Sequence, residues 1–234
     1  MTATTLGYAF LGGILPSLIW LYFLLKEDSR CPEPRRLIAL AFIAGMAAVP
    51  LALPLEQVAK SALAAMPPIL LAWAAIEELL KYAMAAAFIL WRRAVDEPSD
   101  YVIYLITVAL GFAAAENMLF LVAPLSDREF AASVATSDLR FLGSTLLHVI
   151  ASATVGFALA FSALKRPVLR IGAVTLGLIL AVALHTGFNA LIINEGDSSA
   201  LTAFFLVWSL AVVFFATLEI LKYFEYRTLP PNTC

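Results

Sequence analysis

Seven long apolar segments alternate with short polar connections along the 234 residues of the chain. Each segment has roughly 20 residues, which is enough for an α-helix to cross the hydrocarbon core of a bilayer. The pattern predicts an all-α polytopic membrane protein with about seven transmembrane helices, eight being the alternative, in a single integral-membrane domain over residues 1–234. The segments are Leu6–Leu25, Leu37–Leu55, Pro67–Trp91, Tyr101–Ala123, Phe141–Leu164, Ile171–Ile193 and Leu201–Leu221.

The composition agrees with a membrane protein and gives no sign of nucleic-acid binding. The chain is 62% hydrophobic and 14% charged, whereas a soluble domain is usually about 45–50% apolar and about 25% charged. A net charge of –2 provides no basic excess for a nucleic-acid backbone. We therefore expect a lipid bilayer around the protein. The sequence leaves the oligomeric state open.

The positive charges of the connections predict the orientation of the chain. Eleven Lys and Arg residues lie in connections one, three and five and in the C-terminal tail, whereas the other side has only Lys60, Arg128 and Arg140. Because positively charged loops remain in the cytoplasm, the N-terminus is expected outside and the C-terminus inside. Cys31 and Cys234 would then face the reducing cytoplasm, so no structural disulfide is expected.

Ionisable and amide side chains interrupt four of the apolar segments. An Asp, Lys or Arg at mid-bilayer costs about 2.5–3.5 kcal/mol on insertion scales, so three Glu and one Lys exposed to lipid would cost on the order of 10 kcal/mol. These groups must therefore meet one another or a water-filled cavity, which makes them functional candidates. The interrupting residues are Glu77, Glu78, Lys81, Glu116, Asn117, His148, His185 and Asn189.

Four of these residues are expected at one depth in the membrane. Glu77, Glu116, His148 and His185 each lie eight to ten residues from the outer end of their helix. At 1.5 Å per residue, this distance corresponds to roughly 12–15 Å below the outer boundary. We therefore predict a polar pocket in the outer half of the bilayer, with the catalytic core in the helices that span about 67–193.

The residues of this pocket are suited to hydrolysis. Lys81 follows Glu77 by four positions and Glu78 by three, so it can pair with either carboxylate and leave the other to take a proton from water. His185 and Asn189 share one helix face and can both donate to a developing oxyanion. His148 can orient water, shuttle a proton or bind a metal.

Zinc is an open alternative, because Glu77, Glu116, His148 and His185 offer the two imidazoles and carboxylate oxygens that zinc accepts. The His-Glu-x-x-His signature of soluble metalloproteases is absent. Purely structural roles also remain open. The Glu-Glu-x-x-Lys group can be an ion pair that holds the bundle together, and Asn117 can orient Glu116 or bond to a helix backbone. Arg140 can steer a substrate carboxylate or anchor to lipid headgroups.

The polar residues lie in four short motifs. In chain order, the motifs are Glu-Glu-Leu-Leu-Lys at 77–81, Gly-Phe-Ala-Ala-Ala-Glu-Asn at 111–117, Arg140 leading to His148, and His-Thr-Gly-Phe-Asn at 185–189. Together they resemble the PrsW family of intramembrane proteases, whose wider relatives are the CAAX-processing and bacteriocin-immunity (CPBP) membrane proteases. The resemblance implies peptide-bond hydrolysis within the membrane, with a single-span membrane protein such as an anti-sigma factor as the substrate.

By analogy with the CPBP enzymes, the resemblance implies that Glu77 activates water with His148, while His185 and Asn189 stabilise the oxyanion. The chain departs from the CPBP pattern at one position, because Lys81 lies one residue earlier than the Arg of Glu-Glu-x-x-x-Arg. It departs again at Phe141, which precedes His148 by seven residues. The resemblance leaves open whether the enzyme uses a glutamate alone or a metal.

Two other hypotheses follow from the same residues. A proton- or cation-coupled transporter also uses chains of Glu, Lys and His, although the sequence shows no inverted repeat of the kind common in transporters. A non-catalytic membrane partner would use the polar layer only to hold its helices together.

Overall fold

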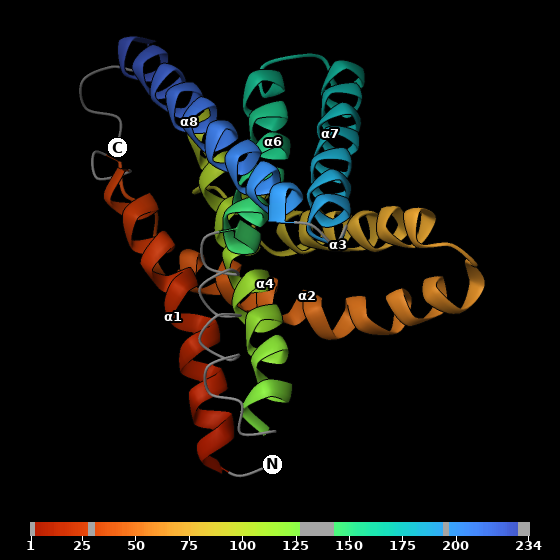
Figure 1. Ribbon diagram of the computed structural model, residues 1–234. Coiled ribbons are helices and arrows are strands. Elements are labelled where there is room, and N and C mark those ends of the chain that lie inside the picture. The colour runs from red at the N-terminus through yellow and green to blue at the C-terminus, as the bar shows by residue number, and fades with distance from the viewer. Residues whose placement is uncertain (1–2, 28–30, 127–142, 194–196, 229–234) are drawn as a thin grey trace.

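The structure, a computed structural model, describes residues 3–27, 31–126, 143–193 and 197–228. Within these ranges the chain forms seven helices and no strand. The helices are α1 (Ala3–Glu27), α2 (Arg35–Ala62), α3 (Met66–Phe88), α4 (Pro98–Ser126), α6 (Thr145–Ser162), α7 (Pro167–Ile193) and α8 (Asp197–Thr228), as Figure 1 shows.

Each predicted apolar segment corresponds to one of these helices, so the all-α architecture is confirmed. Six of the helices are long and apolar enough to cross a membrane. The exception among the described helices is α3, whose 23 residues include the charged side chains of Glu77, Glu78 and Lys81. The number of crossings and the orientation of the chain remain predictions.

The second helix is longer than the sequence pattern predicts. We expected it to end at Leu55, but α2 continues to Ala62, so only residues 63–65 connect it to α3. The added stretch contains neither glycine nor proline, and Glu56 precedes Lys60 by the four residues that favour a helical ion pair. Glu56 therefore lies on a helix and not in a loop.

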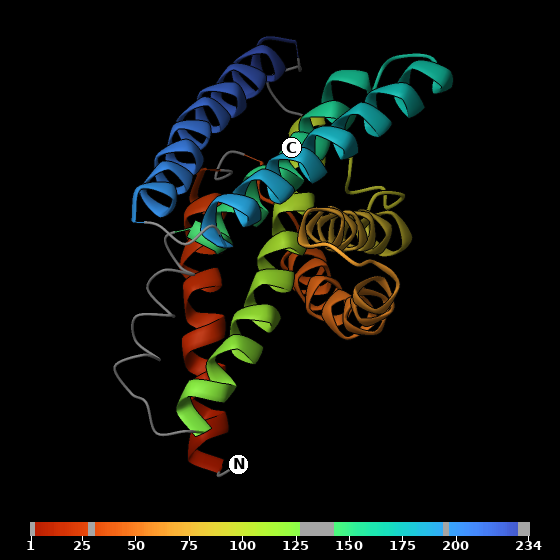
Figure 2. The ribbon, with the colours of Figure 1, turned by 45° about the vertical axis from the view of Figure 1, so that its right-hand side comes forward.

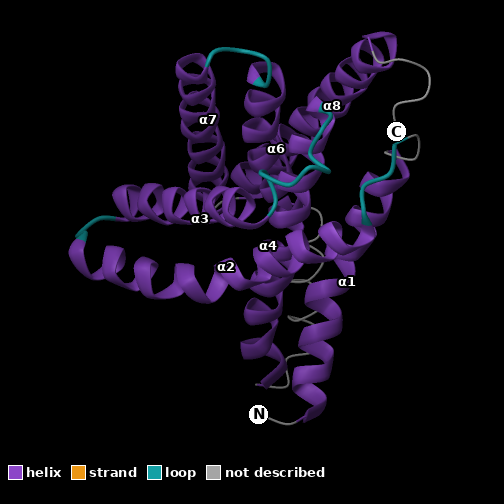
Figure 3. Cartoon of the chain, turned by 180° about the vertical axis from the view of Figure 1, so that it is seen from behind, coloured by secondary structure: helices purple, strands orange, loops and turns teal. Residues whose placement is uncertain are grey.

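The prediction of a common depth assumed that the helices run parallel to one another, but they do not. In Figure 1, α2 and α3 run side by side and crosswise to α6 and α7, and the turned view of Figure 2 shows the same pair nearly end-on. Seen from behind in Figure 3, α3 passes the lower ends of α6 and α7. The polar residues of these helices thus converge where the helices cross. Their depth in the bilayer remains a prediction.

The fourth helix occupies the centre of the fold and packs most extensively against α1, α2 and α6. Two glycines set its approach to α2. A Cβ atom added to Gly45 would lie 1.9 Å from the carbonyl oxygen of Val108, and one added to Gly111 would lie 1.9 Å from that of Phe42. Small residues allow helix backbones to touch in this way in membrane proteins. This contact brings α2 close to the residues that follow Gly111 on α4.

Cys31, in the first connection, is disulfide-bonded, so the prediction that no structural disulfide forms is wrong. The only other cysteine of the chain, Cys234, lies outside the described residues.

Candidate active site

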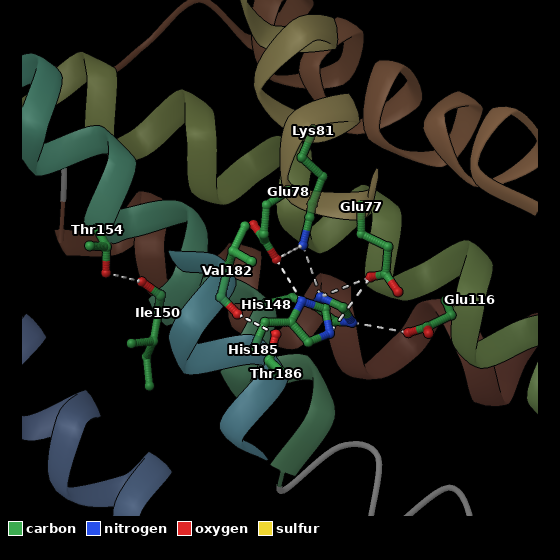
Figure 4. A network of polar contacts seen from close by, with 10 residues as sticks. All are labelled: Glu77, Glu78, Lys81, Glu116, His148, Ile150, Thr154, Val182, His185 and Thr186. Carbon is green, nitrogen blue, oxygen red and sulfur yellow. Dashed lines mark hydrogen bonds and ion pairs between the residues drawn. The ribbon is translucent and has the colours of Figure 1, made fainter. Parts of the chain in front are cut away.

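The third helix presents two neighbouring carboxylates to different surroundings. Successive residues of a helix point about 100° apart. Lys81 donates to Glu78 across a distance of 2.6 Å between Nζ and Oε1, and both side chains are buried. Glu77 lies on the side of Lys81 opposite Glu78, with its carboxylate directed to the two imidazoles, as Figure 4 shows. Of the two partners that the spacing allows, Lys81 therefore takes Glu78 and leaves Glu77 to the cavity.

His148, on α6, lies between α3 and α4. Its Nδ1 atom lies 3.0 Å from Lys81 Nζ, and its Nε2 atom lies 3.0 Å from Glu116 Oε2. Since an ammonium can only donate, Nδ1 accepts from Lys81 and Nε2 donates to Glu116. The ring of Phe112 covers the imidazole, with the two ring centroids 5.4 Å apart. Glu116 thus orients His148.

His185, on α7, is held by the other carboxylate of the pair on α3. Its Nδ1 atom lies 2.8 Å from Glu78 Oε1, so this nitrogen donates to the carboxylate. The remaining nitrogen, Nε2, therefore carries a lone pair, and it lies 3.8 Å from Glu77 Oε2. The two imidazoles meet edge to face, with their centroids 5.1 Å apart. Glu78 thus fixes both the orientation and the tautomer of His185.

Glu77 is left with an oxygen that no side chain satisfies. Its Oε2 atom is buried and has no hydrogen-bond partner among the described residues. It lies 4.0 Å from His148 Nδ1 and 3.8 Å from His185 Nε2. Glu77, His148 and His185 can each offer one ligand atom, and these three atoms lie within 4.8 Å of one another, which is close enough for a single metal ion. Burying an unsatisfied carboxylate oxygen is costly, so this geometry indicates a place for a ligand.

Glu77, His148 and His185 face a cavity of about 590 Å³ that is lined by α2, α3, α4, α6 and α7. Its walls are mainly apolar, and Phe112, Leu119 and Ile192 are examples. Asn189 also reaches it, one helical turn after His185 on the same face of α7. The polar residues that line the cavity are Glu56, Glu77, Glu116, Ser144, His148, His185 and Asn189.

The structure thus brings together Glu77, Glu116, His148, His185 and Asn189, all of which were predicted to share one pocket. Glu78 and Lys81 also belong to the network but do not line the cavity. Asn117 donates to Thr145 Oγ1 over 3.0 Å and so ties α4 to α6. Arg140 lies outside the described residues, as does most of the connection 124–140.

Sequence reasoning missed three residues of this region. Glu56 was placed in a connection, yet it lines the cavity from α2. The indole of Trp73, which also lines the cavity, donates to the backbone carbonyl of Glu56 over 3.1 Å. Phe112 covers His148 and lies under the ammonium of Lys81 at 4.9 Å from the ring centroid. The unbroken helical spacing after Leu55 was the signal that could have revealed Glu56.

A carboxylate and two imidazoles that face one cavity among apolar helices are the arrangement expected of a membrane protease, and comparison with known proteins supports that class. Residues 33–218 match the family described as "PrsW family intramembrane metalloprotease". Because the match covers more than half of the chain, the chain belongs to this family.

One curated relative supports the family assignment. The chain is 30% identical over 149 residues to a protein named "Protease PrsW" from Geobacillus kaustophilus (strain HTA426), and the alignment covers 62% of each protein. No solved structure matches the chain. The wider relationship to the CPBP proteases remains a prediction.

Proposed function

We propose that this protein hydrolyses peptide bonds of membrane-anchored substrates, with a single-span membrane protein, such as an anti-sigma factor, as the natural substrate. One observation carries the proposal. Glu77 Oε2 is buried without a hydrogen bond and lies beside two imidazole nitrogens at the wall of a cavity. A carboxylate in this position is suited to accept the proton of an attacking water molecule.

The other residues of the cavity supply the remaining parts of a hydrolytic site. Asn189 can donate its amide hydrogens to the oxyanion that develops on the substrate carbonyl. His185, expected from the sequence to be a second donor, can donate to an oxyanion only when Nε2 is protonated, because its Nδ1 hydrogen is bonded to Glu78. Glu116 holds His148 through its Nε2 hydrogen. Glu78 accepts from both Lys81 and His185, so it positions the site from behind the cavity wall.

The same residues also fit a zinc ion. Glu77, His148 and His185 would hold it, since two imidazoles and a carboxylate are a common zinc-binding set. The far nitrogen of each histidine meets a carboxylate, which is the usual support for a metal-binding imidazole. A zinc ion there would supply Lewis acidity. The ammonium of Lys81 and the zinc ion would compete for His148 Nδ1. Lys81 must then release this nitrogen, while it keeps its contact with Glu78.

These two forms of the site assign different roles to the carboxylates. Without a metal, Glu77 is the base. With zinc, Glu77 is a ligand, and Glu116 is the carboxylate left to accept a proton at the cavity wall. Its side chain is 20% exposed, whereas that of Glu77 is 8% exposed. In both forms, Glu77 is indispensable.

The proposal is tested by turnover of a single-span membrane peptide by the purified full-length protein in lipid vesicles. We expect cleavage by the wild type and none by Glu77→Gln, which should unfold at the same temperature or higher because it removes a buried charge. Glu219→Gln, at an exposed position on α8, is the matched control. Cleavage by Glu77→Gln at the wild-type rate would overturn the mechanism.

A chelator separates the two forms of the site. Loss of turnover with chelator and its recovery with added zinc would assign Glu77, His148 and His185 as ligands. Turnover that resists the chelator would assign Glu77 as the base.

A further inference from the structure

The cavity beside the candidate active site has a charge that the hydrolysis of a peptide bond does not require. Three carboxylates line it, those of Glu56, Glu77 and Glu116, and no Lys or Arg does so within the described part of the chain. The ammonium of Lys81 is directed to Glu78 and His148 behind the cavity wall. The cavity therefore attracts positive charge.

Glu56 lines the cavity but is not part of the proposed catalytic network. Glu77 and Glu116 lie within the network of His148 and His185, but no hydrogen bond or ion pair to the side chain of Glu56 is found among the described residues. Its side chain is half-buried at the cavity wall. The charges of Glu56 and Glu116 act on one another across the cavity, and both act on Glu77. This repulsion is relieved by a cation that enters between them.

The position of Glu56 is fixed by its contact with α3. The indole of Trp73 donates to the backbone carbonyl of Glu56, which clamps α2 against α3 at this level. Trp73 and Glu77 are four residues apart and share one face of α3. Glu56 and Glu77 thus line one cavity from neighbouring helices. A substrate that occupies the cavity can therefore meet both carboxylates.

We propose that Glu56 forms a specificity site for a Lys or Arg side chain of the substrate, close to the peptide bond that is cut. This inference rests on the proposed function and adds the class of substrate sequence. The apolar walls accept the stem of such a side chain, and the carboxylate of Glu56 receives its charged end.

The test uses the full-length protein in lipid vesicles and a series of single-span peptides. The cleavage site in a parent peptide that is uncharged in this region is first located by mass spectrometry. Lys or Glu is then placed at each of three positions on either side of that site. We expect kcat/KM to rise about tenfold for Lys at one of these positions, as for one hydrogen bond between charged groups.

Charge reversal gives a readout that a merely structural role would not produce. Glu56→Gln should remove the preference for Lys, and Glu56→Lys should reverse it, so that the Glu-bearing peptide becomes the better substrate. Glu219→Gln, which removes the same charge far from the cavity, should keep the wild-type preference. Thermal unfolding of each variant checks that the fold is retained.

The outcomes separate the inference from the function on which it rests. If the wild type cuts the parent peptide but cuts its Lys and Glu derivatives equally well, the inference fails and the proposed function stands. A preference for Lys that survives in both Glu56 variants also overturns the inference, because another group must then supply it. If no peptide is cut, the proposed function and the inference fail together.

Discussion

The ammonium of Lys81 lies 2.6 Å from the carboxylate of Glu78, and each of these side chains is only 1% exposed. The pair is local to one helix, yet it organises three others. Glu78 also accepts from His185 on α7, and Lys81 also donates to His148 on α6, which in turn contacts Glu116 on α4. A single ion pair on α3 therefore connects all the helices that carry the candidate active site.

The first prediction concerns the stability that this pair contributes. Lys81→Met leaves Glu78 as a buried charge without its ammonium, and Glu78→Gln leaves Lys81 without its carboxylate. Removing one partner of a buried pair usually costs about 3–5 kcal/mol of folding free energy. We expect each single variant to lose about that amount, and the double variant to lose clearly less than the sum of the two.

A double-mutant cycle measures this coupling, with the free energy of unfolding obtained from denaturant titration in detergent. The pair Glu219 and Lys222 on α8 is a control of the same i,i+3 spacing, and its carboxylate is 63% exposed at a distance of 3.7 Å. Lys222 is buried and also donates to the backbone carbonyl of Glu27, but its contact with Glu219 is long and its carboxylate partner is in solvent. A pair with a solvated partner contributes about 0–1 kcal/mol, so this second cycle should show little coupling. Equal coupling in the two cycles would contradict a special role for the pair of Glu78 and Lys81.

The second prediction separates positioning from stability at Glu116. This carboxylate is 20% exposed and accepts from His148 Nε2, which it orients. Glu116→Gln keeps a hydrogen-bond acceptor but loses the charge, so the fold should change by less than about 1 kcal/mol. Loss of a carboxylate that supports an active-site imidazole should lower kcat/KM by about 10–100-fold. Glu116→Gln with wild-type turnover would show that His148 needs no charged partner.

The sequence sufficed to predict which residues of α3, α4, α6 and α7 would meet. Glu77, His148 and His185 are too costly in lipid to remain separate, so their convergence follows from the energy of insertion. The same argument could not decide which carboxylate Lys81 would take, because both lie within its reach. That choice depends on His185, whose Nδ1 hydrogen adds a second donor to Glu78 and leaves Glu77 facing the cavity.

The sequence pattern could not predict the crossing of the helices or the position of Glu56 at the cavity. Hydrophobicity identifies a helix but carries no information on its angle to a neighbour, which depends on close contacts such as that between Gly45 and Val108. Glu56 lies just beyond the apolar stretch of α2, where hydrophobicity predicts a connection. Only the observed course of α2 beside α3 shows that this charge faces the cavity.

The third prediction tests the close contact of α2 with α4. An added Cβ at Gly111 would meet the backbone of Phe42, which can move only if the two helices separate. Gly111→Ala should therefore lower the free energy of unfolding by about 1–3 kcal/mol, as overpacking does in other cores. Activity should fall as well, since Gly111 precedes Phe112 and Glu116 on α4.

Gly172 on α7 provides the matched control, because nothing lies within 4 Å of the Cβ that would be added there. Gly172→Ala should leave the free energy of unfolding unchanged or raise it by about 0.5–1 kcal/mol, since alanine has a higher helix propensity than glycine. Thermal and denaturant unfolding of both variants in detergent measure the difference. Similar effects of the two substitutions would mean that the approach of α2 to α4 is not tight at Gly111.

The fourth prediction distinguishes the two asparagines of the site region. Asn189 lines the cavity one turn after His185, whereas Asn117 is buried and donates to Thr145 between α4 and α6. If Asn189 donates to the oxyanion, Asn189→Ala should lower kcat by about 10²–10³-fold, as the loss of an oxyanion-hole donor does in other hydrolases. KM and the unfolding temperature should change little, because the interaction forms fully only in the transition state.

Asn117→Ala should have the opposite profile. It leaves the Thr145 hydroxyl without its donor at a buried contact, so the free energy of unfolding should fall by about 1–3 kcal/mol. Its kcat should remain much closer to that of the wild type than the kcat of Asn189→Ala. Single-turnover kinetics of both variants, together with their unfolding curves, decide the matter. If Asn189→Ala lost stability in proportion to its activity, Asn189 would act in packing, and its proposed role as the oxyanion donor would be wrong.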